Sequence, residues 1–316
     1  MSLDQWETFY RSGAIVTGPA GPDGGYDLEL RAAWVEFFST LGPSASVLDI
    51  GTGNGAVPLI ARQAAQAQGY AWDIHGADLA RIDPVRDVAD GARRFEGIGF
   101  HPGVAAEKLP FEDARFDAVT GHYALEFTRT PDALAEVFRV LKPGGDAQFI
   151  VHHADSALIR SARQSLAECD LVLKETKLYR RLHKLVTMEQ VTPGSTDHAT
   201  TELRNAIQAI KQALPRARQA GGGRVLDVAL DAAQKLLNAR KQLPAATAGL
   251  EVDRAEADMR ASARRLNDLV EHACSAERMD ELQAEAAAAG FTLIERLPQF
   301  HAGNNLVGWQ LLLHRP

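Results

Sequence analysis

Three glycines and two aspartates near the start of the chain have the spacing of a nucleotide-binding turn. Gly51, Gly53 and Gly55 follow a short apolar run and lead into a segment with helical spacing. Glycine has no Cβ and accepts positive φ, so the backbone of such a turn comes close to a ligand. Asp49 lies near the end of this run, and Asp78 lies near the end of the next one. Open α/β sheets bind ligands at such strand ends, and an acidic residue there accepts hydrogen bonds from ribose hydroxyls.

Histidines and a tyrosine after later apolar runs are candidates for acid–base chemistry. His122 and Tyr123 follow the fourth run, His152 and His153 close the fifth, and His301 lies between the last two. Histidine titrates near neutral pH, so each can serve as a base if the reaction needs one. The predicted catalytic residues are His122, Tyr123 and His153. Their spacing does not indicate a metal site.

The elements that position these residues alternate between strand and helix. The expected strands are 46–50, 74–79, 98–104, 116–121, 146–152, 291–297 and 306–314, and the expected helices are 56–68, 84–95, 131–141 and 279–289. A turn is expected at 142–145. Alternation of this kind predicts an α/β fold with a parallel sheet covered on both faces. The last two strands are close enough in sequence to form a hairpin.

Residues 155–275 follow helical spacing only, which predicts an all-helical insertion. One of its helices is expected to stop near Pro215, and a loop is expected at 221–223. The first part of the insertion is rich in Lys and Arg. Two interpretations stay open. The insertion is either a cap that shapes a pocket for a small molecule, or a docking surface for RNA, protein or a second subunit, including a homodimer.

Composition narrows the class of protein. The 316 residues carry a net charge of −7, which argues against a protein that coats nucleic acid. The only two cysteines, Cys169 and Cys274, are too few for a disulfide framework and fit a reducing cytosol. We find no basic-then-apolar leader and no apolar run long enough to span a bilayer. A cytoplasmic protein is the expectation.

Several segments, in order, resemble the motifs of class I S-adenosylmethionine-dependent methyltransferases. They are 47–55, Asp78, 106–111, 115–119 and 141–145. The type-11 branch that includes the ubiquinone/menaquinone-biosynthesis methyltransferases is the most similar. The resemblance covers about residues 40–153 and, more weakly, 278–316. It implies a Rossmann-like seven-stranded, mostly parallel sheet with an antiparallel last strand. It also implies S-adenosylmethionine as cofactor and S-adenosylhomocysteine as product.

The same resemblance implies the binding residues. Asp49 would hold the amino-acid end of the cofactor, Asp78 its ribose, and Leu79 would pack on the adenine. Ala106 would offer a backbone N–H to the adenine edge. The neighbouring Ala105 departs from the family, where Asp, Asn or Ser is common, so a side-chain partner of the adenine amino group is missing. His122 would border the methyl group, which makes it the first choice for the base. The full set of predicted cofactor-binding residues is Asp49, Gly51, Thr52, Gly53, Asn54, Gly55, Asp78, Leu79, Ala106, Glu107 and His122.

The implied domains are an N-terminal lid or cap at 1–40, a cofactor-binding core at 41–154, the helical insertion at 155–275, and a C-terminal helix with two strands at 276–316. The lid carries Trp6, Phe9 and Tyr10 and a glycine-rich loop at 18–25, residue types that suit stacking and gating. The implied activity is in-line methyl transfer to a small-molecule acceptor.

Alternatives remain at this point. The core could act on RNA or protein through the insertion, or bind the cofactor without transfer activity. A nicotinamide enzyme expects G-x-G-x-x-G rather than the G-x-G-x-G found here. Residues 121–124 lack the Pro-Pro-aromatic sequence of amino-directed DNA methyltransferases. Both cysteines lie in the insertion, which disfavours cytosine-carbon and arsenic methylation.

Overall fold

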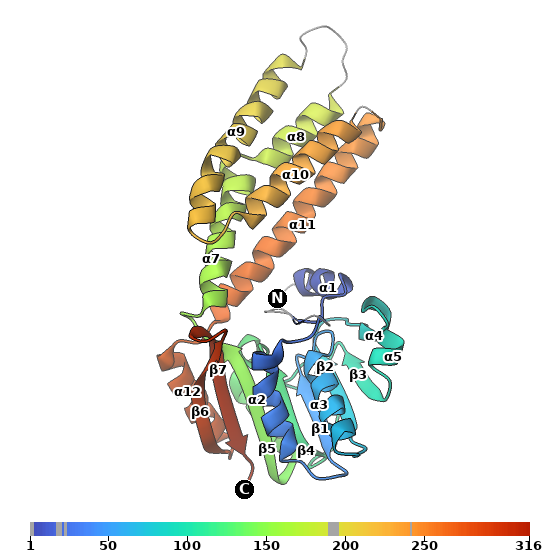
Figure 1. Ribbon diagram of the computed structural model, residues 1–316, viewed down its shortest axis with the longest axis vertical. Helices are drawn as coiled ribbons and strands as arrows, with labels where there is room; N and C mark the ends of the chain where they lie inside the picture. Colours follow the sequence, from blue (N-terminus) through green and yellow to red (C-terminus); the bar gives the residue numbers. More distant parts are fainter. Residues whose placement is uncertain (1–2, 17–20, 22–23, 189–195, 241) are drawn as a thin grey trace. The chain divides into compact units, whose positions relative to one another are not determined.

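The computed structural model describes residues 3–16, 21, 24–188, 196–240 and 242–316. The chain divides into two units. Unit 1 is Met1–Ile159 with His272–Pro316, and unit 2 is Arg160–Glu271. Within the described residues, unit 1 holds all of the β-strands and unit 2 holds only helices (Figure 1).

A seven-stranded sheet runs through unit 1 in the order β3-β2-β1-β4-β5-β7-β6 (Figure 1). The strands are β1 (Ser46–Ile50), β2 (Asp73–Asp78), β3 (Ile98–Pro102), β4 (Phe116–His122), β5 (Leu141–His152), β6 (Thr292–His301) and β7 (Asn305–His314). All pairs from β3 to β5 are parallel, whereas β7 is antiparallel to both of its neighbours. The predicted α/β fold with an antiparallel last strand is therefore confirmed. The strand order reverses between β1 and β4, and such a switch point is where open sheets bind ligands.

Helices cover both faces of this sheet. On one face lie α2 (Leu28–Ser39) and α3 (Ala56–Ala67), and on the other lie α6 (Thr130–Val140) and α12 (Ala276–Ala288) (Figure 1). Val47 and Leu48 of β1 belong to opposite cores. This alternation follows from the pleat, which points successive side chains of a strand to opposite faces.

Helix α2 lies within the predicted lid segment, 1–40, but it is a core helix. Leu30, Trp34 and Phe38 are fully buried in the core that α2 shares with α3 and the sheet. The Asp27 side chain starts the helix by accepting a hydrogen bond from the Leu30 N–H at 3.2 Å, as an N-cap does. The earlier helix, α1 (Asp4–Arg11), carries the aromatic residues. Most of the predicted loop at 18–25 lies outside the described residues.

The single helix expected at 84–95 is wrong, because the backbone breaks in its middle. Two short helices form instead, α4 (Pro84–Asp87) and α5 (Gly91–Arg94). Val88 takes an extended conformation with ψ 140°, and Asp90 takes a left-handed one with φ 56°. Neither conformation continues an α-helix.

The turn expected at 142–145 forms the first part of β5. The Gly144 N–H donates to the carbonyl of Arg315 at 2.8 Å, and the Arg315 N–H donates to the carbonyl of Gly145 at 2.9 Å. These two bonds continue the pairing between β5 and the C-terminal chain past the end of β7, as far as Arg315. A register shift between Phe116 and Ala118 of β4 accommodates the extra length.

Unit 2 is built from packed helices with a core of their own. They are α7 (Ala157–Asp170), a π-helical turn (Leu171–Glu175), α8 (Leu178–Thr187), α9 (Asp197–Gln219), α10 (Arg224–Ala239) and α11 (Ala245–His272). The expected stop near Pro215 is wrong, because α9 continues past it. Proline removes one helical hydrogen bond, while Ile210 and Ala217 on either side are buried in the core of the unit and hold the helix in place. The loop at 221–223 between α9 and α10 is confirmed.

No helix of the described residues is both long enough and apolar enough to cross a bilayer.

Candidate functional site

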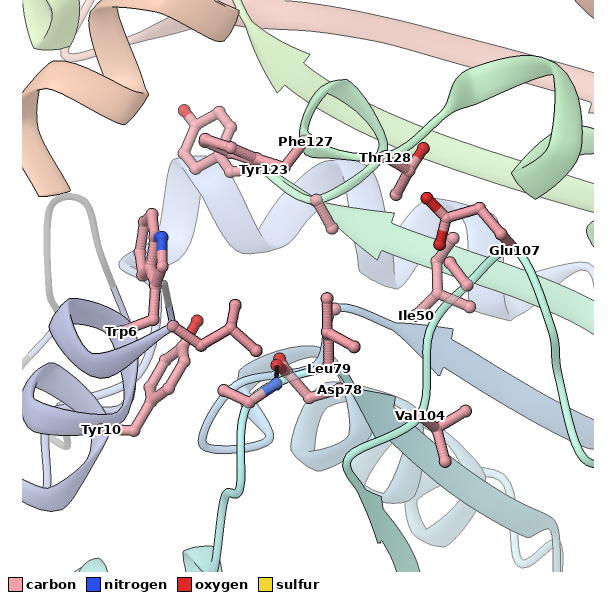
Figure 2. Close-up of a pocket in the computed structure, with 15 residues that line it drawn as sticks. Trp6, Tyr10, Ile50, Asp78, Leu79, Val104, Glu107, Tyr123, Phe127 and Thr128 are labelled. Carbon is pink, nitrogen blue, oxygen red and sulfur yellow. Dashed lines mark hydrogen bonds between the residues drawn. The ribbon is translucent and has the colours of Figure 1, made fainter. Parts of the chain in front are cut away.

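A cleft opens at the carboxyl ends of β1, β2 and β4. Its first cavity holds about 750 Å³ of space between the lining side chains, part of which is open to solvent. Figure 2 shows its side chains around an open centre, with Trp6 and Tyr10 on one side and Tyr123 and Phe127 on another. A second cavity of about 430 Å³ shares four of its residues, Trp6, Tyr10, Gly51 and Tyr123. The two cavities are therefore adjacent, and together they are called the cleft.

The glycine turn forms the floor where the cavities meet. Gly51 has φ 59°, and a Cβ added there would lie 2.3 Å from the Cβ of Ala124. Gly53 has φ 51°, and a Cβ there would lie 2.6 Å from the Tyr10 ring. Both positions line the cleft. Only glycine allows this backbone shape together with these close approaches.

Asn54 and Gly55 were expected to bind the cofactor, but the structure gives them another place. The fully buried Asn54 donates from Nδ2 to the carbonyls of Tyr10 and Ala14, each at 2.8 Å. A Cβ at Gly55 would meet the ring of Phe100 at 2.8 Å, inside the core. Neither belongs to the described residues that line the two cavities. They fix the turn and the segment after α1 and do not face the cleft.

Asp78 lies at the end of β2 and lines the first cavity. Its Oδ2 accepts from the Gly53 N–H at 2.7 Å, and its Oδ1 accepts from the Ala80 N–H at 2.8 Å. Burial raises the pKa of this carboxyl to about 6, although the two backbone hydrogen bonds act in the opposite direction. Each oxygen keeps a lone pair for a ligand hydroxyl. The neighbouring Leu79 is 47% exposed and presents an apolar surface to the same cavity.

Asp49 lies on β1 and lines the second cavity together with Thr52. Its Oδ1 accepts from the Thr120 hydroxyl at 2.8 Å. Burial raises the pKa of Asp49 to about 7, against the effect of its hydrogen bonds. The buried Thr52 hydroxyl lies beside this carboxyl, and its hydrogen bond is one of those that lower the pKa of Asp49. This end of the cleft therefore offers a carboxyl and a hydroxyl close to the start of α3.

Ala106 and Glu107 both line the first cavity, as expected for residues near the cofactor. The Glu107 side chain has a structural task as well, because its Oε1 accepts from the Arg129 N–H at 2.8 Å. This bond ties the loop that contains Ala106 to the start of α6. Val104 and Thr128, which line the same cavity, are additions that sequence reasoning missed.

His122 lines the second cavity, but its hydrogen bonding argues against the predicted role as base. Its Nδ1 accepts from the indole N–H of Trp34 at 3.1 Å, so the proton of the neutral ring lies on Nε2. Burial lowers the pKa of His122 well below its ordinary value, which keeps the ring neutral. The buried Nε2 has no partner in the described part of the chain. His122 therefore presents an N–H donor to the cleft and has no free lone pair with which to take a proton.

Tyr123 was also predicted to be catalytic, yet its hydroxyl is used within the fold. The hydroxyl donates to the Val307 carbonyl at 3.1 Å, and burial raises the pKa of Tyr123 well above its ordinary value. The residue has φ 56°, and strained backbone of this kind is concentrated at functional sites. Its ring lies between those of His122 and His152, with centroid distances of 4.3 Å and 3.8 Å. Tyr123 thus contributes a wall of the cleft and no acid or base.

Two further candidate histidines, His153 and His301, lie away from the cleft. His153 stacks on Trp309 at 4.5 Å, and its Nδ1 accepts from the Asp155 N–H at 3.0 Å. His301 forms an ion pair with Asp27 at the start of α2. Neither is among the described residues that line the two cavities. The prediction that His153 is catalytic is therefore not supported by its position.

A buried pair that was not among the predicted catalytic residues lies at this end of the cleft. Glu126 belongs to the short 3-10 helix Leu125–Phe127 after β4, and His152 ends β5. Glu126 Oε1 lies 2.7 Å from His152 Nδ1 and also accepts the His152 backbone N–H at 2.8 Å. The ring of His152 lines the second cavity. The sequence signal was a carboxylate and a histidine that follow neighbouring parallel strands, whose ends meet at one edge.

Comparisons with known proteins match the segment of the chain that carries β1 to β5. Residues 48–149 match the profile of the family described as "Methyltransferase domain". Over 105 residues the chain is 39% identical to the ubiquinone/menaquinone biosynthesis C-methyltransferase UbiE of Desulfotalea psychrophila, covering 32% of this chain and 39% of that protein. Over 113 residues it is 28% identical to a malonyl-[acyl-carrier protein] O-methyltransferase of Enterobacter lignolyticus, covering 35% and 41%. The chain thus spans about two fifths of these relatives.

Among solved structures, the [4+2]-cyclase SpnF is similar with a TM-score of 0.48 at 15% identity, covering 99% of this chain and 94% of that one.

Proposed function

We propose that this chain, whose residues 48–149 belong to the class I S-adenosylmethionine-dependent methyltransferases of the UbiE type, transfers a methyl group to a small-molecule acceptor. The observation that carries the proposal is the cleft itself. Its first cavity joins the Asp78 carboxylate to an apolar surface, and its second joins Asp49 to the glycine turn. The apolar surface, Asp78 and Asp49 correspond in turn to the adenine, the ribose and the charged amino-acid tail of the cofactor.

A buried polar atom of the cleft supports the fit. Nε2 of His122, a residue that lines the second cavity, has no partner in the described part of the chain. Unpaired buried polar groups cost stability, of order 1–3 kcal/mol each. A ligand with its own polar groups at this place would remove that cost. The amino-acid tail of S-adenosylmethionine, with its carboxylate and ammonium, has the required chemistry.

The residues of the chain would bind the cofactor and orient it. Asp78 would accept the ribose hydroxyls, and Leu79 would pack against the base. Asp49 would face the ammonium, while the N–H groups at the start of α3 favour a carboxylate. When bound, the cofactor supplies a methyl carbon activated by its sulfonium. The protein then contributes mainly proximity and alignment of the acceptor with that carbon.

Aromatic side chains favour a small acceptor with a flat, apolar part. Trp6 and Tyr10 of α1 and Tyr123 line both cavities, and Tyr26 lines the second. Trp6 also contacts the ring of Phe127 edge-to-face at 5.6 Å. Such rings bind planar ligands by stacking and exclude water from the site. Helix α1 and Tyr26 are thus parts of the predicted lid segment that border the cleft.

The proposal is tested by binding and by turnover. Calorimetric titration with S-adenosylhomocysteine should give one site per chain. Incubation with S-adenosylmethionine labelled at the methyl group and a panel of small hydroxylated and amino compounds should then transfer the label to one of them. Absence of binding would refute the proposal, whereas binding without transfer to any panel member would favour the non-catalytic alternative.

Unit 2 carries the second candidate, action on RNA or protein. Around α8, five basic or titratable side chains line an open hollow with a single carboxylate: Lys177, Arg180, Arg181, His183, Lys184 and Glu202. An RNA partner would bind such a surface with a strong dependence on salt. Titration of the protein with a short labelled RNA at low and high salt distinguishes this alternative, because a salt-independent or undetectable affinity contradicts it.

A further inference from the structure

We propose that Glu126 and His152 form a general-base dyad, in which Nε2 of His152 removes a proton from the methyl acceptor. The inference rests on the proposed function and deepens it, because it names the group that activates the acceptor. It also restricts the acceptor to compounds whose nucleophilic atom carries a removable proton, such as a hydroxyl group.

The hydrogen bonds of the pair fix the tautomer of His152. Glu126 Oε1 accepts the His152 backbone N–H at 2.8 Å, so this oxygen acts as an acceptor. With Glu126 ionised, this oxygen has no proton to donate, so the ring nitrogen Nδ1, at 2.7 Å from it, is the donor. A neutral ring with its proton on Nδ1 has a lone pair on Nε2. This arrangement is the opposite of His122, where the Trp34 indole N–H leaves the proton on Nε2.

Burial and packing hold the dyad in one geometry. The side chains of His152 and Glu126 are only 4% and 1% exposed. The His152 ring stacks on Tyr123 at 3.8 Å with an interplanar angle of 18°, and Phe127 meets its edge at 6.1 Å. Glu126 Oε2 is buried without a partner in the described residues. The carboxylate is therefore committed to the histidine on one oxygen and has no other protein contact there to weaken that bond.

The position of the ring suits a base for this reaction. His152 lines the second cavity beside Asp49, Gly51 and Gly53, where the tail and the sulfonium end of the cofactor are proposed to lie. With Nδ1 held by Glu126, Nε2 lies on the other side of the ring and is left for a ligand. An acceptor that reaches this ring beside the cofactor would meet the lone pair on Nε2 of His152.

With a hydroxyl acceptor, the O–H bond breaks and its proton passes to Nε2 of His152. The oxygen electron pair forms the new bond to the methyl carbon, while the electron pair of the C–S bond goes to sulfur and neutralises the sulfonium. The imidazolium stays beside the Glu126 carboxylate until it loses its proton to solvent. Glu126 acts through His152 and is a positioning residue, as in other carboxylate–histidine pairs.

The first experiment reads the tautomers without any turnover. Protein labelled with ¹⁵N at histidine is measured by NMR, with and without S-adenosylhomocysteine, and each ring is assigned by His→Gln replacement. We expect the proton of His152 on Nδ1 and the proton of His122 on Nε2. Glu126→Gln should shift His152 toward a mixture of tautomers. A His152 ring with its proton on Nε2 in the wild type would overturn the proposal.

The second experiment measures transfer to a panel of substituted phenols that spans several pKa units. His152→Ala should lower kcat by about 10²–10⁴-fold, the usual contribution of a general base. His152→Asn is the companion variant, because its amide still donates to Glu126 but cannot take the proton. Exogenous imidazole should restore part of the rate of His152→Ala. Glu126→Gln should give a smaller loss and a changed pH profile of kcat.

Controls separate the dyad from the proposed function. His153→Ala alters the adjacent histidine, which lies on Trp309 away from the cleft, and should keep the wild-type rate. All variants should bind S-adenosylhomocysteine with the wild-type Kd. Loss of binding in the wild type would refute the proposed function, whereas normal binding with an unchanged rate in both His152 variants would refute only the dyad. Binding without transfer to any phenol would refute the hydroxyl acceptor.

Discussion

The indole N–H of Trp34 donates to Nδ1 of His122 at 3.1 Å, and this bond determines what His122 offers to the cleft. Both residues are buried, so water does not compete with His122 for the indole N–H. The ring of His122 is held further by stacking on Tyr26 at 4.2 Å. A helix on the face of the sheet thus sets the protonation of a side chain at the end of β4. The result is a donor at a position where the sequence alone predicted a base.

Replacement of Trp34 should allow the neutral His122 ring to adopt both tautomers. Trp34→Phe keeps an aromatic ring but leaves His122 Nδ1 buried and unpaired, so the free energy of unfolding should fall by about 1–3 kcal/mol. Urea unfolding measures this loss, and ¹⁵N NMR should show a mixture of His122 tautomers. Trp72→Phe is the matched control, because its indole donates to the Gly42 carbonyl at 2.8 Å. That variant should lose stability without any change at His122, and a fixed His122 tautomer in Trp34→Phe would contradict the argument.

Asp78 should dominate the affinity for the nucleoside part of the cofactor. Asp78→Ala removes a charged hydrogen-bond acceptor and should weaken S-adenosylhomocysteine binding ten- to a hundredfold, about 1.5–3 kcal/mol. Calorimetry measures the change in Kd. The control is Asp83→Ala, because Asp83 caps α4 by accepting from the Arg86 N–H at 3.2 Å, pairs with the Arg86 side chain at 3.4 Å and does not line the two cavities. Equal affinities in wild type and Asp78→Ala would remove the ribose assignment.

The strand-and-helix pattern was predictable from the sequence because it is local. β1 was predicted at Ser46–Ile50 and forms at those residues, since a short apolar run before a glycine turn has few other conformations. The glycine positions and Asp78 were predictable for the same reason. The break at Val88 and Asp90 was not, because backbone conformation there depends on neighbours that the pattern does not reveal.

The acid–base residues could be predicted only as a set of candidates. Each follows a strand, and the strand pattern alone does not say which ring faces the cleft. The roles of His122, His152 and His153 differ through partners far away in sequence: Trp34, Glu126 and Trp309. Such contacts depend on the packing of α2, the 3-10 helix and β7 onto the sheet, which no local pattern encodes.

Asp49 should make the stability of the ligand-free protein depend on pH. Burial raises its folded-state pKa to about 7, above the ordinary value of 3.8. The folded state therefore binds a proton that the unfolded state lacks between these values, and stability falls as pH rises through this window. Asp49→Asn keeps the acceptor for Thr120 without the charge. It should raise the free energy of unfolding by about 1–3 kcal/mol at about pH 8 and change it little at about pH 4.

Urea unfolding at these two pH values measures the Asp49 effect, and calorimetry gives its cost in function. The same variant should weaken S-adenosylhomocysteine binding, because it removes the charge proposed to face the ammonium. Asp117→Asn is the control, since Asp117 is a partly exposed carboxylate of β4 that pairs with Lys142 at 2.8 Å. A wild-type pH dependence in Asp49→Asn would show that another group is responsible.

We expect Gly51→Ala to destabilise the protein unless the neighbouring Ala124 is made smaller. Its φ of 59° and the 2.3 Å approach of a Cβ to the Ala124 Cβ impose both backbone strain and a clash. Gly69 has a similar φ of 71° with nothing within 4 Å, so Gly69→Ala measures the strain alone, about 1–2 kcal/mol. Gly51→Ala should cost about 1–3 kcal/mol more than that. In the double variant Gly51→Ala with Ala124→Gly, this excess should be recovered and the strain should remain, as urea unfolding of the double-mutant cycle would measure. Additive losses would show that Ala124 does not confine the turn.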